Sequence, residues 1–148
     1  MDAALIWNPN GYADIALSGG DLAHDDGLET AVILSLFCDA RADADDSLDA
    51  GADPRGYWGD SFAAIAGDVT GSKLWLIVRQ KQLADVANRA QEYAAAALAW
   101  LVEDGIAATV NVIAEWIAQG TLALSIAIAK PGSNDVFQRR YQYVWSAL

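Results

Sequence analysis

The sequence predicts an α+β fold: short N-terminal strands, central helices with one long helix, and a C-terminal antiparallel sheet packed on the helices. Two observations predict it. Between residues 83 and 101 small and apolar residues recur at steps of three and four, whereas from residue 108 onward apolar residues recur at every second position. The first period is that of a helix and the second is that of a strand.

The first 25 residues are expected to form a small β-unit. Turn-forming residues at 8–11 and 18–20 separate three short apolar runs, at residues 5–7, 15–17 and 22–24. Asp26 then stands three residues before Glu29, which is the spacing of a capping box with Asp as the N-cap. A helix is therefore expected from Leu28 to near Asp39.

Residues 39–60 are predicted to form a solvated acidic loop. They contain seven aspartates and only two basic residues, with almost no large apolar side chain before Tyr57. Tyr57 and Trp58 stand between glycines at the end of this loop. Two adjacent aromatic residues indicate an anchor that returns the loop to the body of the protein.

The central helices follow a second polar connection. The apolar run at residues 74–78 predicts a short buried helix, which contains Trp75 and bends near 80–82 into the long helix. The long helix has a stripe formed by Leu83, Ala87, Ala90, Ala94, Ala97 and Leu101, widened by Trp100. Its alanines let another element approach closely, and Gly105 suits a left-handed C-terminal cap. We expect structural roles for Trp75, Trp100 and Gly105.

Beyond Gly105 the alternation predicts an antiparallel hairpin that covers the long helix, with strands at 108–116 and 121–128. Residues 134–148 are predicted to add a strand whose aromatic side chains share one face, namely Phe137, Tyr141, Tyr143 and Trp145. This strand can complete the sheet, present its edge and aromatic face to another chain, or do both. Removing residues 134–148 is expected to leave a folded domain.

Length and charge narrow the class of protein. The 148 residues are expected to form one domain, and no span of about 20 apolar residues or secretory signal is visible. Nine basic and 20 acidic residues give 9 − 20 = −11, a charge that disfavours nucleic acid and anionic membranes as partners. Cys38 is the sole cysteine and is expected to be a buried thiol.

Candidate chemistry is sparse. His24 is the sole histidine, no Gly-x-Ser-x-Gly or phosphate-binding glycine loop occurs, and the acidic loop does not fit the EF-hand pattern. Glu103 is the one carboxylate of interest, and a structural role as an acceptor for backbone amides or an arginine is favoured over catalysis. We therefore expect no enzyme, no catalytic residue, no metal site and no cofactor.

An interaction surface is the remaining interpretation. Six tryptophans and five tyrosines exceed the needs of a core of this size, and aromatic residues are favoured as interface anchors. The candidate interaction residues are Phe137, Tyr141, Tyr143 and Trp145 in the tail, with Arg55, Tyr57 and Trp58 at the end of the acidic loop.

Four segments of the sequence, in this order and spacing, resemble the Mu-like phage baseplate protein family. They are residues 25–32, 55–60, 71–76 followed by Arg79, and 97–105. The resemblance runs from near Ile15 to near Lys130. That family resembles the wider group of contractile-tail baseplate wedge subunits, some of which are labelled lysozyme-like. The wider group has Glu-Pro-Arg after its long helix; here Glu103 matches, whereas Asp104 and Gly105 replace the other two.

The resemblance implies a structural subunit of the inner wedge in a virion tail baseplate, assembled in the host cytoplasm. Its partners would be larger wedge proteins and the tail sheath protein, with tail tube or hub proteins also open. The sheet at 107–145 would join wedge proteins to the first sheath ring by β-strand augmentation. Two alternatives stay open: a peptidoglycan-degrading enzyme that uses Glu103, and an acidic metal-binding module that includes Asp43, Asp45 and Asp49.

Overall fold

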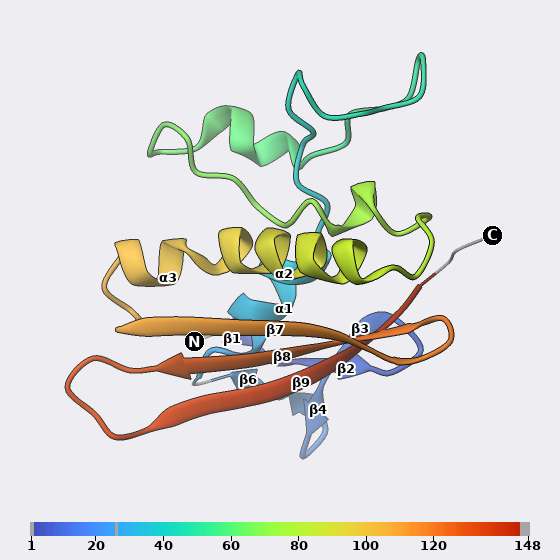
Figure 1. The fold of residues 1–148 in the computed structure, drawn as a ribbon. Helices are drawn as coiled ribbons and strands as arrows, with labels where there is room; N and C mark the ends of the chain where they lie inside the picture. The colour runs from blue at the N-terminus through green and yellow to red at the C-terminus, as the bar shows by residue number, and fades with distance from the viewer. Residues whose placement is uncertain (1, 26, 146–148) are drawn as a thin grey trace.

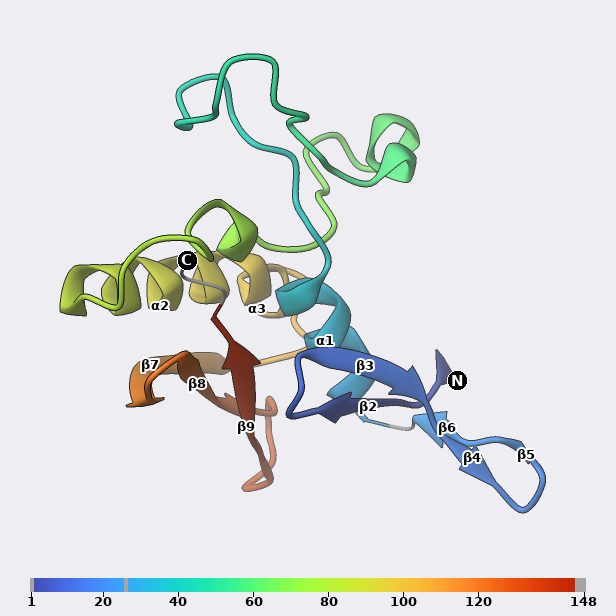
Figure 2. The ribbon, with the colours of Figure 1, turned by 90° about the vertical axis from the view of Figure 1, so that its right-hand side faces the viewer.

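The protein has an α+β fold in the computed structural model, which describes residues 2–25 and 27–145 (Figure 1). The helices lie over the C-terminal sheet, and a long excursion of the chain rises on the far side of the helices. The N-terminal strands lie beside the sheet and α1, as the turned view shows (Figure 2). The predicted fold class is confirmed.

The C-terminal sheet has three antiparallel strands in the order β7-β8-β9. They are β7 (Thr109–Ala118), β8 (Thr121–Ala129) and β9 (Val136–Val144). Gly120 turns the β7–β8 hairpin with φ of 78°, a conformation that a side chain disfavours. The alternation in the sequence therefore predicted β7 and β8 within two residues at each end, whereas β9 begins two residues after the start of the predicted strand at 134–148 and ends at Val144.

The core lies between this sheet and α2 (Ala84–Leu98). Four side chains of β8 face the helices and are at most 2% exposed: Leu122, Leu124, Ile126 and Ile128. Each contributes roughly 1.5–3 kcal/mol by burial. Ala90 and Ala94 are completely buried on the facing side of α2, so the small side chains let helix and sheet approach closely, as predicted.

The long helix is shorter than predicted at its start and divided near its end. Leu83 precedes the first helical residue, and its backbone is extended. Its side chain is 53% exposed, so it does not belong to the buried stripe, contrary to the prediction. A break at Ala99 separates α2 from α3 (Trp100–Glu103). Gly105 has φ of 72° after α3, and its N–H donates to the Val102 carbonyl at 3.1 Å, so the predicted left-handed cap is present.

Two shorter helices precede α2. The run at 74–78 forms a 3-10 helix, η2 (Leu74–Leu76), rather than an α-helix, with Leu74 and Ile77 buried. Helix α1 (Glu29–Phe37) lies where predicted, although Asp26 lies outside the described residues. The N-cap residue is Leu28, whose side chain makes no capping hydrogen bond. The Asp25 carboxylate accepts the Thr30 N–H in the first turn at 2.6 Å.

The N-terminal region contains six short strands instead of three. They pair as three two-stranded sheets: β1 (Asp2–Ala3) with β6 (His24–Asp25), β2 (Leu5–Asn8) with β3 (Tyr12–Ile15), and β4 (Leu17–Ser18) with β5 (Asp21–Leu22). Buried Ala16 divides the predicted strand at 15–17, because its N–H and carbonyl pair with Ala4 and Ala23.

The chain between α1 and η2 leaves the body of the protein. Residues 43–70, here called the arm, contain a 3-10 helix, η1 (Trp58–Phe62), which has no buried residue. The predicted anchoring by Tyr57 and Trp58 is wrong, since these side chains are 49% and 74% exposed. Ionic and polar contacts hold the arm instead.

Candidate functional site

The aromatic side chains of β9 face the core. Phe137, Tyr141 and Tyr143 lie opposite Ile128, Leu124 and Leu122 of β8 and share their face of the sheet. Tyr141 is 2% exposed, and Trp145, which follows the strand, is 4% exposed. The prediction that the four tail aromatics share one face is confirmed, and that face is turned away from solvent.

Aromatic stacking joins the N-terminal region to the sheet. The ring of Trp7 stacks on Phe37 with centroids 3.6 Å apart, and Phe37 stacks on Tyr143 at 5.6 Å. The sequence interpretation missed Trp7 and Phe37 as partners of this strand, because their distance along the chain hides the contact. The available sequence signal for this contact was that Trp7 is the single aromatic residue of its predicted strand and Phe37 that of its predicted helix.

Trp145 continues this aromatic group at the same end of the sheet, with its ring centroid 6.1 Å from that of Tyr143. Its Nε1 donates to the Gln80 carbonyl at 2.8 Å, and its ring meets that of Trp116 edge to face at 5.1 Å. Trp145, the residue that follows β9, is thus fixed to the segment that precedes α2. Deleting residues 134–148 would remove part of the core, so the expectation of a folded truncated domain does not fit this packing.

The outer edge of β9 offers backbone groups for pairing. The Trp145 N–H donates to the Gly120 carbonyl at 2.7 Å, so the odd-numbered residues of β9 pair with β8. Even-numbered residues then direct their N–H and C=O groups outward. The Trp7 indole donates to the Gln142 carbonyl at 2.8 Å, but in the described structure no other strand pairs along residues 136–140.

The opposite edge of the sheet is covered. The Ala114 N–H of β7 donates to Gln91 Oε1 of α2 at 3.1 Å, and Trp116 Nε1 donates to the Leu83 carbonyl at 3.0 Å. These contacts place α2 along β7 (Figure 1). The first half of β9 is therefore the more accessible edge of this sheet.

Charged contacts hold the base of the arm. The Arg55 guanidinium binds Asp39 at 2.7 Å and lies over the Trp75 ring, with Cζ 4.4 Å from the centroid. Trp75 Nε1 donates to the Ala40 carbonyl at 2.7 Å. These contacts place Trp75 between Ala40 and Arg55, and they hold Arg55 against the body of the protein.

Lys73 forms a second contact between the arm and the chain that leads to η2. Its ammonium group binds Asp43 and lies 2.7 Å from Asp46. The hydrogen bond from Lys73 lowers the pKa of Asp46 below its ordinary value. The arm is thus ionically fixed at two places.

The second half of the arm carries an apolar surface. An exposed group, here called the arm patch, consists of Tyr57, Trp58, Phe62, Ile65 and Val69. Trp58 meets Tyr57 and Phe62 with ring centroids 5.4 and 6.4 Å apart. Of the predicted interaction residues, Tyr57 and Trp58 therefore belong to an exposed surface, and Phe62, Ile65 and Val69 complete it. Trp58, Phe62, Ile65 and Val69 recur at steps of four, three and four, a helical period that the sequence interpretation did not use, although the structure forms only the short 3-10 helix η1 there.

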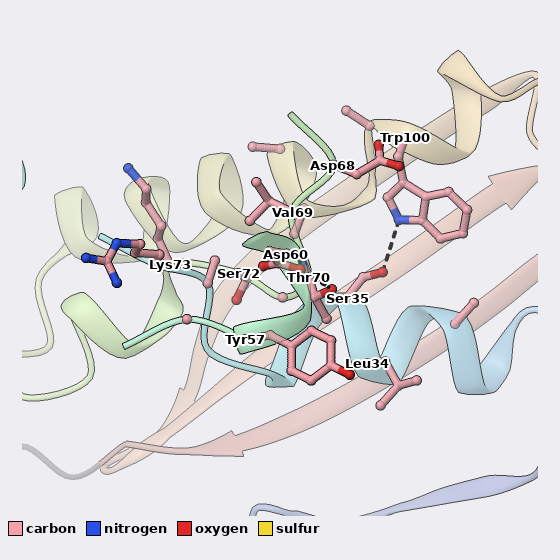
Figure 3. Close-up of a pocket in the computed structure, with 18 of the residues that line it drawn as sticks. Leu34, Ser35, Tyr57, Asp60, Asp68, Val69, Thr70, Ser72, Lys73 and Trp100 are labelled. Carbon is pink, nitrogen blue, oxygen red and sulfur yellow. Dashed lines mark hydrogen bonds between the residues drawn. The ribbon is translucent and has the colours of Figure 1, made fainter. Parts of the chain in front are cut away.

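A groove of about 1520 Å³ separates the arm from α1 and α3 (Figure 3). Leu34 lies on its α1 side, Trp100 on its α3 side, and Tyr57 and Val69 on the arm. Trp100 Nε1 donates to Ser35 Oγ at 3.1 Å, a contact that joins α3 to α1. Glu103 also lines the groove. It is exposed, and its carboxylate has no hydrogen-bond or ion-pair partner among the described residues.

The histidine, the cysteine and the carboxylates are the candidate groups for chemistry in residues 2–25 and 27–145. His24 is exposed on β6, and no group of three His, Cys, Asp or Glu side chains in this part could hold a metal ion. Burial raises the pKa of the Cys38 thiol, which disfavours the nucleophilic thiolate. No helix in these two segments is long and apolar enough to span a membrane.

An open sheet edge and an exposed aromatic patch define a class of protein whose prominent surfaces suit protein–protein contact. The chain belongs to the family described as Phage protein GP46, whose model matches residues 28–135. It is similar to the baseplate protein gp46 of Escherichia phage Mu, with 46% identity over 91% of each chain. It is also 42% identical to the Mu-like prophage FluMu protein gp46 of Haemophilus influenzae, over 98% of each chain.

Proposed function

We propose that this protein is a structural subunit of a contractile phage tail baseplate. In this proposal the chain acts as a single inner-wedge domain, which joins larger wedge proteins to the first ring of the sheath. Its place in the mature particle is the tail baseplate, after assembly in the host cytoplasm. The similarity to the baseplate protein gp46 of phage Mu, at 46% identity, supports the baseplate role.

The joining step proposed is β-strand augmentation at the outer edge of β9, and the accessible edge at residues 136–140 is the observation that carries it. An incoming strand of the sheath protein would pair with the outward N–H and C=O groups of Gln138 and Arg140. It would displace the Arg139 guanidinium, which donates to the Gln138 carbonyl at 2.8 Å. Phe137, Tyr141, Tyr143 and Trp145 serve this contact indirectly, because their packing fixes the strand that is extended.

The remaining surfaces are assigned to other components. The arm, with Arg55, Tyr57 and Trp58, would face wedge, tube or hub proteins, since it lies beyond the helices and away from the β9 edge (Figure 2). This arrangement would let one subunit contact the sheath and another protein at the same time.

A proline at the outward edge position tests the proposal. Gln138→Pro removes an N–H that β8 does not use, whereas Gln138→Thr keeps that N–H and serves as the matched control. We expect particles with Gln138→Pro to carry this chain at the baseplate, detected by gold-labelled antibody, but to lack normal sheaths. Normal sheaths with a folded Gln138→Pro protein would contradict strand augmentation, and no label on the baseplate would contradict the structural role.

A further inference from the structure

We propose that the groove between the arm and helices α1 and α3 binds a segment of a different protein, in which lysine or arginine side chains alternate with apolar ones. This surface is separate from the β9 edge. The inference adds the chemistry of a second partner to the proposed function and does not depend on strand augmentation.

The arm patch supplies the apolar contact. Trp58 and Phe62 are 74% and 80% exposed, although they are among the largest apolar side chains of the protein. Burial of apolar surface lowers the free energy, so an exposed aromatic cluster of this kind marks a surface that a partner covers. Single exposed apolar residues would carry no such meaning, but here five lie within 13 positions, from Tyr57 to Val69.

The arm is held in place before any partner binds. The Asp60 carboxylate accepts the Thr70 hydroxyl at 2.8 Å and the Thr70 N–H at 3.1 Å. Together with the Lys73 and Arg55 contacts, this bond fixes both ends of the segment that carries the patch. A fixed arm loses little conformational entropy on binding, which favours association.

The groove continues the arm patch onto the helices. Of the arm patch, Tyr57, Trp58 and Val69 line the groove, whereas Phe62 and Ile65 lie outside it. Leu34, which is 44% exposed, lines it from α1 (Figure 3). An extended segment could therefore place apolar side chains against both walls. The volume of about 1520 Å³ suits a peptide segment better than a small ligand, because small-ligand pockets span about 300–1,000 Å³.

Charge identifies the occupant. Asp68, Glu103 and Asp104 line the groove and take part in no ion pair among the described residues. Two of the basic groups in its lining, Lys73 and Arg55, are already paired with aspartates. The third basic group, Arg41, forms no ion pair within residues 2–25 and 27–145, so one free guanidinium stands against these three free carboxylates. The free charge at the groove is still negative and attracts a cationic segment. A second copy of this chain, with a net charge of −11, would be repelled.

Site-specific crosslinking in cells that produce the whole particle tests this inference. Benzoylphenylalanine replaces Val69 in the groove, and in a control protein it replaces Leu17, which is 74% exposed on the N-terminal strand β4. We expect the Val69 position to crosslink another protein, at a segment with lysine or arginine beside apolar residues. Crosslinks to a second copy, to an acidic segment or to nothing would overturn the inference.

Neutral variants of the groove then test the charge. Asp68→Asn combined with Glu103→Gln is expected to lower the crosslink yield about fivefold, whereas Asp14→Asn combined with Asp21→Asn on the N-terminal strands leaves it unchanged. All four side chains are exposed, so the variants should keep the wild-type Tm. An unchanged yield in the groove variant would overturn the role of charge. The baseplate label and the Gln138→Pro sheath assay report separately on the proposed function.

Discussion

The Tyr141 hydroxyl donates a hydrogen bond to Glu29 Oε1 at 2.9 Å, and thereby joins the last strand of the protein to the first turn of α1. Glu29 also binds Arg139 of the same strand. Two residues separated by more than 100 positions thus share one polar contact at the edge of the core. This contact attaches β9 to the helices from its buried face and leaves its outer edge accessible.

Replacing Tyr141 by Phe removes the hydroxyl and keeps the ring. A hydrogen bond to a charged group contributes roughly 1.5–3 kcal/mol, so the free energy of unfolding should fall by about that amount in urea titrations. Tyr57→Phe is the matched control, because Tyr57 is exposed, and it should leave stability unchanged. Equal stability of the Tyr141→Phe variant and the wild type would contradict the assigned role of this bond.

Alkaline pH should destabilise the protein through its buried tyrosines. Burial raises the pKa of both Tyr141 and Tyr143, and the negative charges of Glu29 and Asp39 add to the effect. The folded state therefore keeps the neutral hydroxyls when the unfolded chain ionises. The free energy of unfolding is expected to fall as pH rises above about 10, which is the ordinary pKa of tyrosine.

The double variant Tyr141→Phe with Tyr143→Phe should show a smaller loss of stability between pH 9 and pH 11 than the wild type. Urea titrations at several pH values across this range provide the measurement. A Tyr12→Phe variant serves as the control, because Tyr12 is exposed. Parallel pH profiles for the double variant and the wild type would show that these hydroxyls ionise equally in both states.

Enlarging Ala94 should destabilise the contact between α2 and the sheet. Ala94 is completely buried, so Ala94→Leu must displace its neighbours and should cost about 1–3 kcal/mol. Ala95→Leu places the same side chain on the exposed face of the helix, and its effect should stay within about 0.5 kcal/mol. Thermal unfolding followed by circular dichroism measures both. Similar Tm values for the two variants would argue against close packing at Ala94.

Removing Lys73 should free the arm and leave the core intact. Lys73→Met breaks the contacts with Asp43 and Asp46, and limited proteolysis should then cut residues 43–70 faster while Tm changes little. Lys81→Met is the control, since Lys81 is exposed. Because Lys73 lowers the pKa of Asp46, the wild-type arm should lose protection as pH falls below about 4. Equal cleavage of both variants would exclude Lys73 as a support of the arm.

Deleting residues 134–148 should unfold the protein. The deletion removes Tyr141 and Trp145, whose side chains are buried, and exposes the apolar face of β8. We expect loss of the cooperative thermal transition. Gln138→Thr changes only an exposed side chain of β9 and should retain that transition. A truncated protein with a native-like transition would restore the prediction made from the sequence.

The sequence by itself determined the α+β class, the three-stranded sheet and the helix that packs on it. These features follow from the local spacing of apolar residues. Apolar residues at every second position form one apolar face of a strand, and alanines at helical spacing let α2 approach β8. Gly105 was equally predictable, because a helix end often requires a left-handed residue. The resemblance carried by four separated motifs also identified the family, which the comparisons with known proteins established.

Only the tertiary structure decided which aromatic residues are free to bind a partner. The alternation of apolar residues placed Tyr141 and Trp145 on one face of the strand, but it does not reveal which face another element covers. The residues that cover this face, Trp7, Phe37 and Gln80, come from distant parts of the chain. The reverse holds for Trp58, which was expected to anchor the loop and is exposed. Its surroundings depend on the contacts of Lys73, Arg55 and Thr70 at the base of the arm, and long-range contacts of this kind leave no period in the sequence.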